Sequence, residues 1–149
     1  MAVTSIWPVK SRLDHVINYA RNPEKTRERS LVAQASLHAI DNVIEYAADT
    51  IKTEERAYVS CLNCQEDNAA VQMMETKRYW GKTDGRLCFH GYQSFAAGEV
   101  TAETAHAIGV KLAEELWGER FEVVIATHCN TGHYHNHFVI NSVSWADGY

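Results

Sequence analysis

The chain has 149 residues, of which 46% are hydrophobic, and its formal net charge is −5. This length predicts one domain, and the hydrophobic fraction excludes a disordered chain. No apolar run is long enough to span a bilayer, and the first residues lack the basic start and apolar stretch of a signal peptide, so we expect a cytoplasmic protein. The acidic balance disfavours nucleic acid as a partner without excluding it, because basic residues cluster early in the chain.

Residue patterning predicts an α+β fold with about five strands and packed helices. We predict strands at residues 3–9, 56–62, 87–95, 121–127 and 134–143. We predict helices at residues 11–21, 31–51, 67–80 and 101–117, the last of them capped by Thr101 and ended by Gly118. No low-complexity linker divides residues 1–149, which therefore read as one domain. Residues 145–149 resemble the start of a hairpin turn, so we expect this domain to be cut from a longer protein.

Two of the predicted helices contain an internal repeat. Residues 13–26 and 40–53 are identical at seven of fourteen positions, and each copy carries a tyrosine, Tyr19 or Tyr46, followed by Lys-Thr. Two copies are too few for a repeat protein, and two similar amphipathic helices are the simplest explanation. The repeat leaves open which tyrosine does chemistry.

The segment between residues 127 and 141 holds four of the chain's eight histidines. His133, His135 and His137 alternate along a predicted strand, so their side chains share one face. His128 ends the preceding predicted strand, and the turn residues 130–132 predict a hairpin that returns it to the same place. Three imidazoles that converge from two adjacent strands form a metal site with open coordination positions, which is typical of catalytic sites.

These residues resemble the MOB-P class of conjugative relaxases, or mobilisation nucleases, of the HUH endonuclease superfamily. Four segments carry the resemblance: the opening strand with the helix around residues 17–26, residues 90–101 with the following helix, residues 116–123, and the histidine segment with Asn141. The resemblance implies an N-terminal catalytic domain with a mainly antiparallel, ferredoxin-like core. It also implies site-specific nicking and rejoining of single-stranded DNA at the origin of transfer of a plasmid or integrative element.

The resemblance implies that His128, His135 and His137 hold the metal. The spacing of the last two to Asn141 matches the family, although residues 133–135 fit the literal His-hydrophobe-His pattern better. The family often has an acidic residue where this chain has Asn130, which removes one group that would orient a ligand imidazole. We expect one divalent ion, Mn²⁺ or Mg²⁺ in function, with Zn²⁺, Ni²⁺ or Co²⁺ also compatible with imidazole ligands.

In the family, a tyrosine attacks the scissile phosphate and becomes joined to the 5′ end of the DNA. Tyr19 is the preferred nucleophile, because it lies on the helix directly after the first strand, and Tyr46 is the alternative. Glu99 is a candidate proton acceptor or ligand-orienting group, or simply an acid in the first turn before a helix. Candidate DNA contacts are Arg21, Lys25 and His133, with Trp7 and Tyr92 as candidate base-stacking residues.

The implied partners are single-stranded DNA at an origin of transfer, auxiliary relaxosome proteins and a coupling protein. Two alternatives explain the same histidines. One is a non-catalytic DNA-binding module with a structural metal site, and the other is a replication-initiator nuclease of the same superfamily. A covalent protein–DNA product separates the first alternative from a relaxase.

Overall fold

The structure is a computed structural model that describes residues 2–10, 25–49 and 58–149. In chain order its elements are β1 (Val3–Lys10), α2 (Lys25–Ala47), β2 (Val59–Leu62), the 3-10 helix η1 (Glu66–Asn68), α3 (Ala69–Tyr79), β3 (Arg86–Ser94), α4 (Ala102–Trp117), β4 (Val123–His128) and β5 (His135–Asn141). None of the helices in the described ranges combines the length and apolarity that crossing a bilayer requires.

The five strands of the described residues form one sheet in the order β1-β3-β5-β4-β2, and every neighbouring pair is antiparallel. The predicted α+β fold with a five-stranded, mainly antiparallel sheet is therefore confirmed. The strand β5, which carries His135 and His137, lies at the centre between β3 and β4. The edge strand β1 contains Pro8, a residue that sheets accept mainly at their edges.

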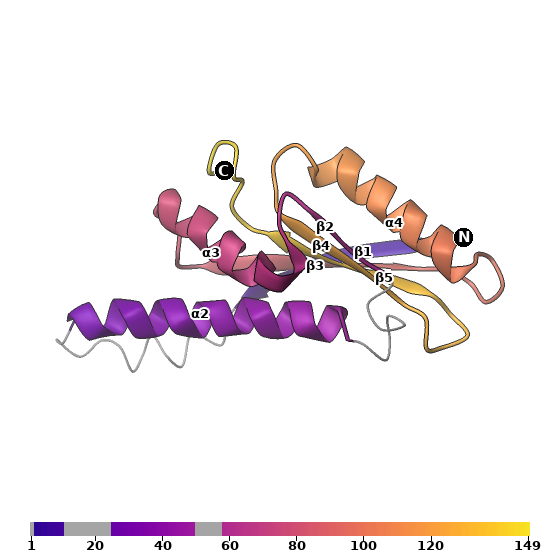
Figure 1. Ribbon diagram of the computed structural model, residues 1–149, viewed down its shortest axis with the longest axis horizontal. Helices are drawn as coiled ribbons and strands as arrows, with labels where there is room; N and C mark the ends of the chain where they lie inside the picture. Colours follow the sequence, from indigo (N-terminus) through magenta and orange to yellow (C-terminus); the bar gives the residue numbers. More distant parts are fainter. Residues whose placement is uncertain (1, 11–24, 50–57) are drawn as a thin grey trace.

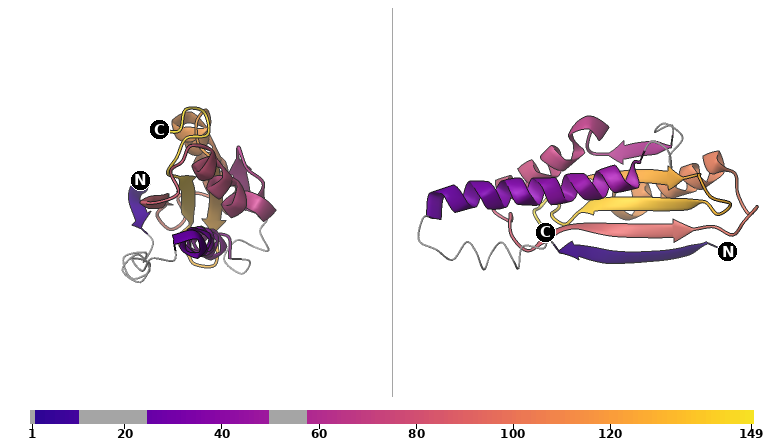
Figure 2. Two further views of the ribbon diagram at one scale, coloured as in Figure 1. Left: turned by 90° about the vertical axis from the view of Figure 1, so that its left-hand side faces the viewer. Right: turned by 90° about the horizontal axis from the view of Figure 1, so that it is seen from below.

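Helices cover both faces of the sheet (Figure 1). The helices α2 and α3 pack on one face, where Ile40, Met73, Met74, Val124 and Val139 are buried in a common core. The helix α4 packs on the other face, where Ala113 meets the strand residues Val123, Ile125, Phe138 and Ile140. Figure 2 shows α2 lying along the strands in the view from below. Alternation along β4 and β5 thus sends successive side chains into different cores.

The ends of α4 follow from two residues. The Thr101 hydroxyl accepts a hydrogen bond from the Thr104 amide at 3.1 Å, which satisfies one unpaired amide of the first turn. The helix ends before Gly118, as predicted, although Gly118 does not adopt the left-handed conformation with which many helices end. Gly118 has φ −57°, and a Cβ there would lie 2.7 Å from the Glu114 carbonyl oxygen. Glycine is needed for this close approach.

Several predicted bounds shift. The helix predicted from residue 31 begins at Lys25 instead. The sequence did not predict its first turns, because residues 25–30 are mostly charged and show no apolar periodicity. The strand predicted at 56–62 is described only over Val59–Leu62, and the helix predicted at 67–80 begins as η1 before α3. The helix predicted at residues 11–21 lies outside the described residues.

Candidate active site

Five aromatic side chains share the face of the sheet that α2 covers. They come from three neighbouring strands: His90 and Tyr92 from β3, His135 and His137 from β5, and His128 from β4. The register places Tyr92 opposite His137 and His128 opposite His135. The hairpin that the sequence predicts is therefore present, and it returns His128 to the face of the other histidines.

The imidazole of His137 touches those of His90 and His128. The His90 Nε2 and His137 Nδ1 atoms are hydrogen-bonded at 2.9 Å, and the rings of His128 and His137 have centroids 4.1 Å apart. His128 Nε2 donates a hydrogen bond to the Ala47 carbonyl oxygen at 2.7 Å, since a carbonyl oxygen only accepts. All three rings are nearly buried. The result is a cluster of His90, His128 and His137, held to the C-terminal end of α2.

Tyr46 lies over this cluster. Its ring centroid is 6.5 Å from that of His90, 6.3 Å from His128 and 6.2 Å from His137, and all three contacts are edge-on. The side chain is 56% exposed. Because the next residue, Ala47, binds His128, the end of α2 and the histidine cluster form one packed unit. A tyrosine in this place meets solvent on one side and imidazoles on the other.

A hollow of about 500 Å³ opens beside Tyr46 and is lined by Trp7, Asn42, Val43, Tyr46, His90, Tyr92 and His137. Aromatic rings form most of its wall. Trp7 packs on His90 with centroids 4.9 Å apart, and Tyr92 stacks on His135 at 5.4 Å with only 27° between the planes. Such walls suit flat, apolar faces of a ligand, while the imidazoles supply its polar contacts.

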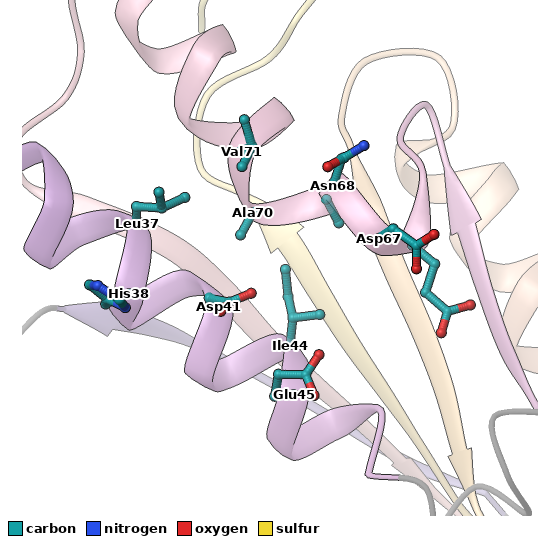
Figure 3. A pocket seen from close by; sticks show the side chains of 11 residues that line it. Leu37, His38, Asp41, Ile44, Glu45, Asp67, Asn68, Ala70 and Val71 are labelled. Carbon is teal, nitrogen blue, oxygen red and sulfur yellow. The ribbon is translucent and has the colours of Figure 1, made fainter.

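A second hollow between α2 and the η1–α3 segment is acidic (Figure 3). Asp41 and Glu45 line it from α2, and Glu66 and Asp67 line it from η1. Four carboxylates around one opening repel an anion such as a nucleic-acid backbone. Glu45 faces this hollow while its neighbour Tyr46 faces the histidines, so α2 separates an acidic surface from the candidate active site.

The surroundings keep two of the histidines neutral. Burial lowers the pKa of His90, and the nearby His128 lowers it further. Burial also lowers the pKa of His135, with a smaller contribution from His133. The neutral imidazole is the form that binds metal ions and that accepts hydrogen bonds. The face therefore offers neutral imidazole nitrogens that can bind a metal ion or accept a hydrogen bond near neutral pH.

Within the described residues, no three His, Cys, Asp or Glu side chains are arranged as a preformed metal site. The predicted set of His128, His135 and His137 lies on one face, but only His128 and His137 are in ring contact. His135 turns away into its stack on Tyr92. The set fits a metal by the chemistry of its donors and by its placement on paired strands, and the predicted ligands stay a prediction.

The other predicted residues fall in different places. Tyr19 and Arg21 lie outside the described residues, and Lys25 is the first residue of α2, with a side chain that is not described. Glu99 is exposed and accepts a hydrogen bond from the Ala96 amide of its own turn at 2.9 Å. His133 is exposed in the β4–β5 turn, where its carbonyl accepts from the Thr131 hydroxyl.

His90 is the main residue that sequence reasoning did not assign to the site. Its position in a predicted strand, two residues before Tyr92, placed both side chains on one face. The missing information was the pairing of β3 with β5, which joins segments far apart in the chain. A sheet order of this kind does not follow from periodicity.

Comparisons with known proteins identify the family of the chain. The sequence matches the family described as "Relaxase: MobA/VirD2-like, nuclease domain" over residues 46–149. The chain belongs to this family. The matched part of the relaxase nuclease domain begins at Tyr46 and includes His90, His128, His135 and His137, whereas Tyr19 precedes it.

Curated relatives of the domain have related names. Protein rlx of Staphylococcus aureus is 42% identical over 89 residues, which cover 60% of this chain and 28% of that protein. The group II intron-interrupted relaxase LtrB of Lactococcus lactis subsp. cremoris is 33% identical over 144 residues, which cover 93% of this chain and 25% of that protein. The chain thus spans only about a quarter of the length of these relatives.

Proposed function

We propose that this relaxase nuclease domain nicks and rejoins single-stranded DNA at an origin of transfer through attack by a tyrosine. The observation that carries the proposal is the contact of Tyr46 with His90, His128 and His137 in an open hollow. A tyrosine placed against imidazoles that can bind metal would combine a nucleophile with a means of stabilising charge on phosphate. The family membership supports a nuclease.

Of the two candidate tyrosines, we propose Tyr46 as the nucleophile. Its ring lies within contact of the histidine cluster, and it is exposed enough to meet a DNA strand. The sequence repeat explains the ambiguity, because it gives the same local pattern around Tyr19.

The proposed reaction exchanges one phosphodiester for another. The Tyr46 oxygen forms a bond to the scissile phosphorus, and the bond to the 3′ oxygen breaks. The tyrosine hydroxyl gives up its proton and the departing 3′ oxygen takes one, so atoms and charge balance. The 5′ end stays joined to the tyrosine, and attack by a 3′-hydroxyl reverses the step and reseals the strand.

We propose that His128, His135 and His137 hold one divalent ion, with Mn²⁺ or Mg²⁺ as the functional ion. A ligand imidazole donates from one ring nitrogen and binds metal through the other. His128 already donates from Nε2 to Ala47, so Nδ1 would be the atom that holds the ion. His135 would complete the set with its ring turned away from Tyr92. The chemistry that such an ion would supply is neutralisation of charge on the phosphate.

His90 then has a distinct role. If His137 held the ion through Nε2, its Nδ1 would carry a proton, and the partner 2.9 Å away is His90 Nε2. His90 must stay neutral to accept that hydrogen bond, and the lowered pKa of its ring favours this form. We therefore propose His90 as the residue that orients His137.

The DNA strand is proposed to run along the hollow beside Tyr46. Trp7 and Tyr92 provide ring faces on which bases stack. His133, Arg21 and Lys25 remain proposed phosphate contacts, and Glu99 a proposed proton acceptor. Auxiliary relaxosome proteins and a coupling protein are further proposed partners, on the strength of the family alone.

The test uses overlapping single-stranded oligonucleotides that cover both strands of the DNA flanking the gene. The purified chain is incubated with each oligonucleotide and Mn²⁺, and the products are separated under denaturing conditions. We expect one strand to be cut at one position, giving a 3′-hydroxyl that a polymerase extends and a 5′ end bound to protein. Addition of EDTA, or His128→Ala with His137→Ala, should abolish the cut.

Two outcomes would overturn the proposal. Tight, sequence-specific binding without any cut, by a folded protein that binds Mn²⁺, would identify a non-catalytic DNA-binding module. A cut that maps to a replication origin, in a fragment that does not make a plasmid transferable between cells, would identify a replication initiator.

A further inference from the structure

A chain of polar side chains crosses the sheet on the face opposite the histidines. His106 of α4 contacts Ser60 of β2 through Nε2 at 2.7 Å and Thr127 of β4 through Nδ1 at 2.8 Å. The Thr127 hydroxyl contacts Asn136 of β5 at 2.6 Å, and Asn136 contacts Gln93 of β3 at 2.9 Å. This hydrogen-bonded network thus joins α4 to four strands of the sheet.

The directions of these hydrogen bonds follow from one fixed end. The Ala105 carbonyl only accepts, so the group that faces it at 2.7 Å is the Asn136 amide nitrogen. The Asn136 oxygen therefore faces Thr127, whose hydroxyl donates to it. Because the single hydroxyl proton of Thr127 is donated to Asn136, the Thr127 oxygen accepts a hydrogen bond from the His106 Nδ1–H. The His106 Nε2 atom is then the acceptor for the Ser60 hydroxyl.

Every polar group at the buried centre of this network has a hydrogen-bond partner. Thr127 and Asn136 are fully buried, and the Asn136 side chain makes three hydrogen bonds. Burial lowers the pKa of His106, which keeps the ring in the neutral form that this pattern needs. A buried network that is complete holds its members in one arrangement, because each alternative leaves a polar group unsatisfied.

The helix α4 is fitted closely to this network. Gly109 faces Asn136, and a Cβ at that position would lie 2.6 Å from the Asn136 amide nitrogen. Only glycine lets the helix approach so closely without displacing the amide. The glycine and the amide therefore fix the distance between α4 and the central strands.

The network lies directly behind the histidines. Thr127 precedes His128, Asn136 lies between His135 and His137, and Thr127 and Asn136 are partners across β4 and β5. We propose that Thr127 and Asn136 are positioning residues that, through the hydrogen-bonded chain from His106, fix the backbone from which His128, His135 and His137 project. This inference rests on the proposed metal-dependent function of those histidines.

The test compares two substitutions of Thr127, at the centre of the network, with one substitution of Ser60, at its end. Thr127→Val keeps the shape but removes the hydroxyl, and Thr127→Ser restores it. Ser60→Ala removes a partly exposed hydroxyl at the far end of the chain. Mn²⁺ affinity, the kcat and KM of nicking, and the imidazole ¹⁵N shifts of His128 and His137 are measured for each variant.

We expect Thr127→Val to weaken Mn²⁺ binding about tenfold, the lower end of the effect of groups that orient metal ligands. It should lower kcat and leave the KM for DNA unchanged, while Thr127→Ser and Ser60→Ala stay close to the wild type. Wild-type affinity, kcat and imidazole shifts in folded Thr127→Val would overturn the inference.

A second variant covers the case in which Thr127→Val does not fold. Gly109→Ala keeps every hydrogen-bonding group and pushes on Asn136, so it should shift the same imidazole signals and lower Mn²⁺ affinity. Unchanged signals and affinity in Gly109→Ala would overturn the inference. If the wild type binds no Mn²⁺, the proposed function fails, and the imidazole shifts alone then decide whether Thr127 and Asn136 position the histidines.

Discussion

The ring of Tyr46 meets the ring of His137 edge-on, with centroids 6.2 Å apart and an angle of 87° between the planes. Tyr46 belongs to the last turn of α2, and His137 belongs to the central strand β5. The contact therefore brings the two halves of the proposed chemistry together, a nucleophile from a helix and a metal ligand from the sheet.

The first prediction concerns the metal ligands. His128→Ala and His137→Ala should each abolish Mn²⁺ binding, and His135→Ala should weaken it strongly, because each removes one of three imidazole ligands. Titration followed by calorimetry or by the electron paramagnetic resonance of free Mn²⁺ measures the effect. His38→Ala is the matched control, since His38 is exposed on α2. Normal binding in His137→Ala would exclude the proposed ligand set.

The second prediction separates His90 from the ligands. His90→Ala should weaken Mn²⁺ binding about 10- to 100-fold, as expected when a group that orients a ligand is lost. His90→Gln should recover much of that affinity, because its amide oxygen also accepts a hydrogen bond. The same titration measures both variants. If both abolish binding as completely as His137→Ala, His90 is itself a ligand.

The third prediction concerns base stacking. Trp7→Ala should weaken binding of the cognate single strand by about 1–3 kcal/mol, the usual contribution of an aromatic ring stacked on a base. Trp145→Ala provides the control, because Trp7 is 43% exposed and Trp145 46%. Fluorescence anisotropy without metal measures binding independently of cutting. Equal losses in both variants would argue against a stacking role for Trp7.

The fourth prediction concerns pH and His106. Burial lowers the pKa of His106 below its unfolded value of about 6.5, so at mildly acid pH the unfolded chain binds a proton that the folded chain does not. This contribution leaves stability unchanged above about pH 6.5 and reduces it as the pH falls below that value. The free energy of unfolding should therefore drop less between pH 7 and pH 5 in His106→Gln than in the wild type, as measured by urea titration. An identical drop would show that His106 does not titrate differently on folding.

Local patterns were enough to predict much of the fold. Alternating apolar residues located the strands, and Thr101 and Gly118 marked the two ends of α4. The hairpin that joins His128 to His135 was predictable because it is local and its turn residues are characteristic. The start of α2 was not, since its first turns are charged and take their helical form without a periodic apolar face.

Much of the candidate site could not be predicted from the sequence, because it depends on contacts between segments that are far apart in the chain. The placement of His90 beside His137 depends on β3 lying next to β5, and the placement of Tyr46 depends on how α2 packs on the sheet. The repeat made Tyr19 and Tyr46 locally equivalent, so sequence alone did not choose between them. The polar network behind the histidines was likewise hidden, because Ser60, His106 and Asn136 meet only in the folded chain.

The most direct test of the account identifies the tyrosine that becomes joined to DNA. The chain is incubated with its cognate single strand and Mn²⁺, the covalent product is digested with protease and nuclease, and the nucleotide-bearing peptide is sequenced by mass spectrometry. We predict that the label lies on Tyr46, that Tyr46→Phe forms no covalent product while still binding Mn²⁺ and DNA, and that Tyr19→Phe still forms it. A label on Tyr19, with covalent product persisting in Tyr46→Phe, would contradict the account.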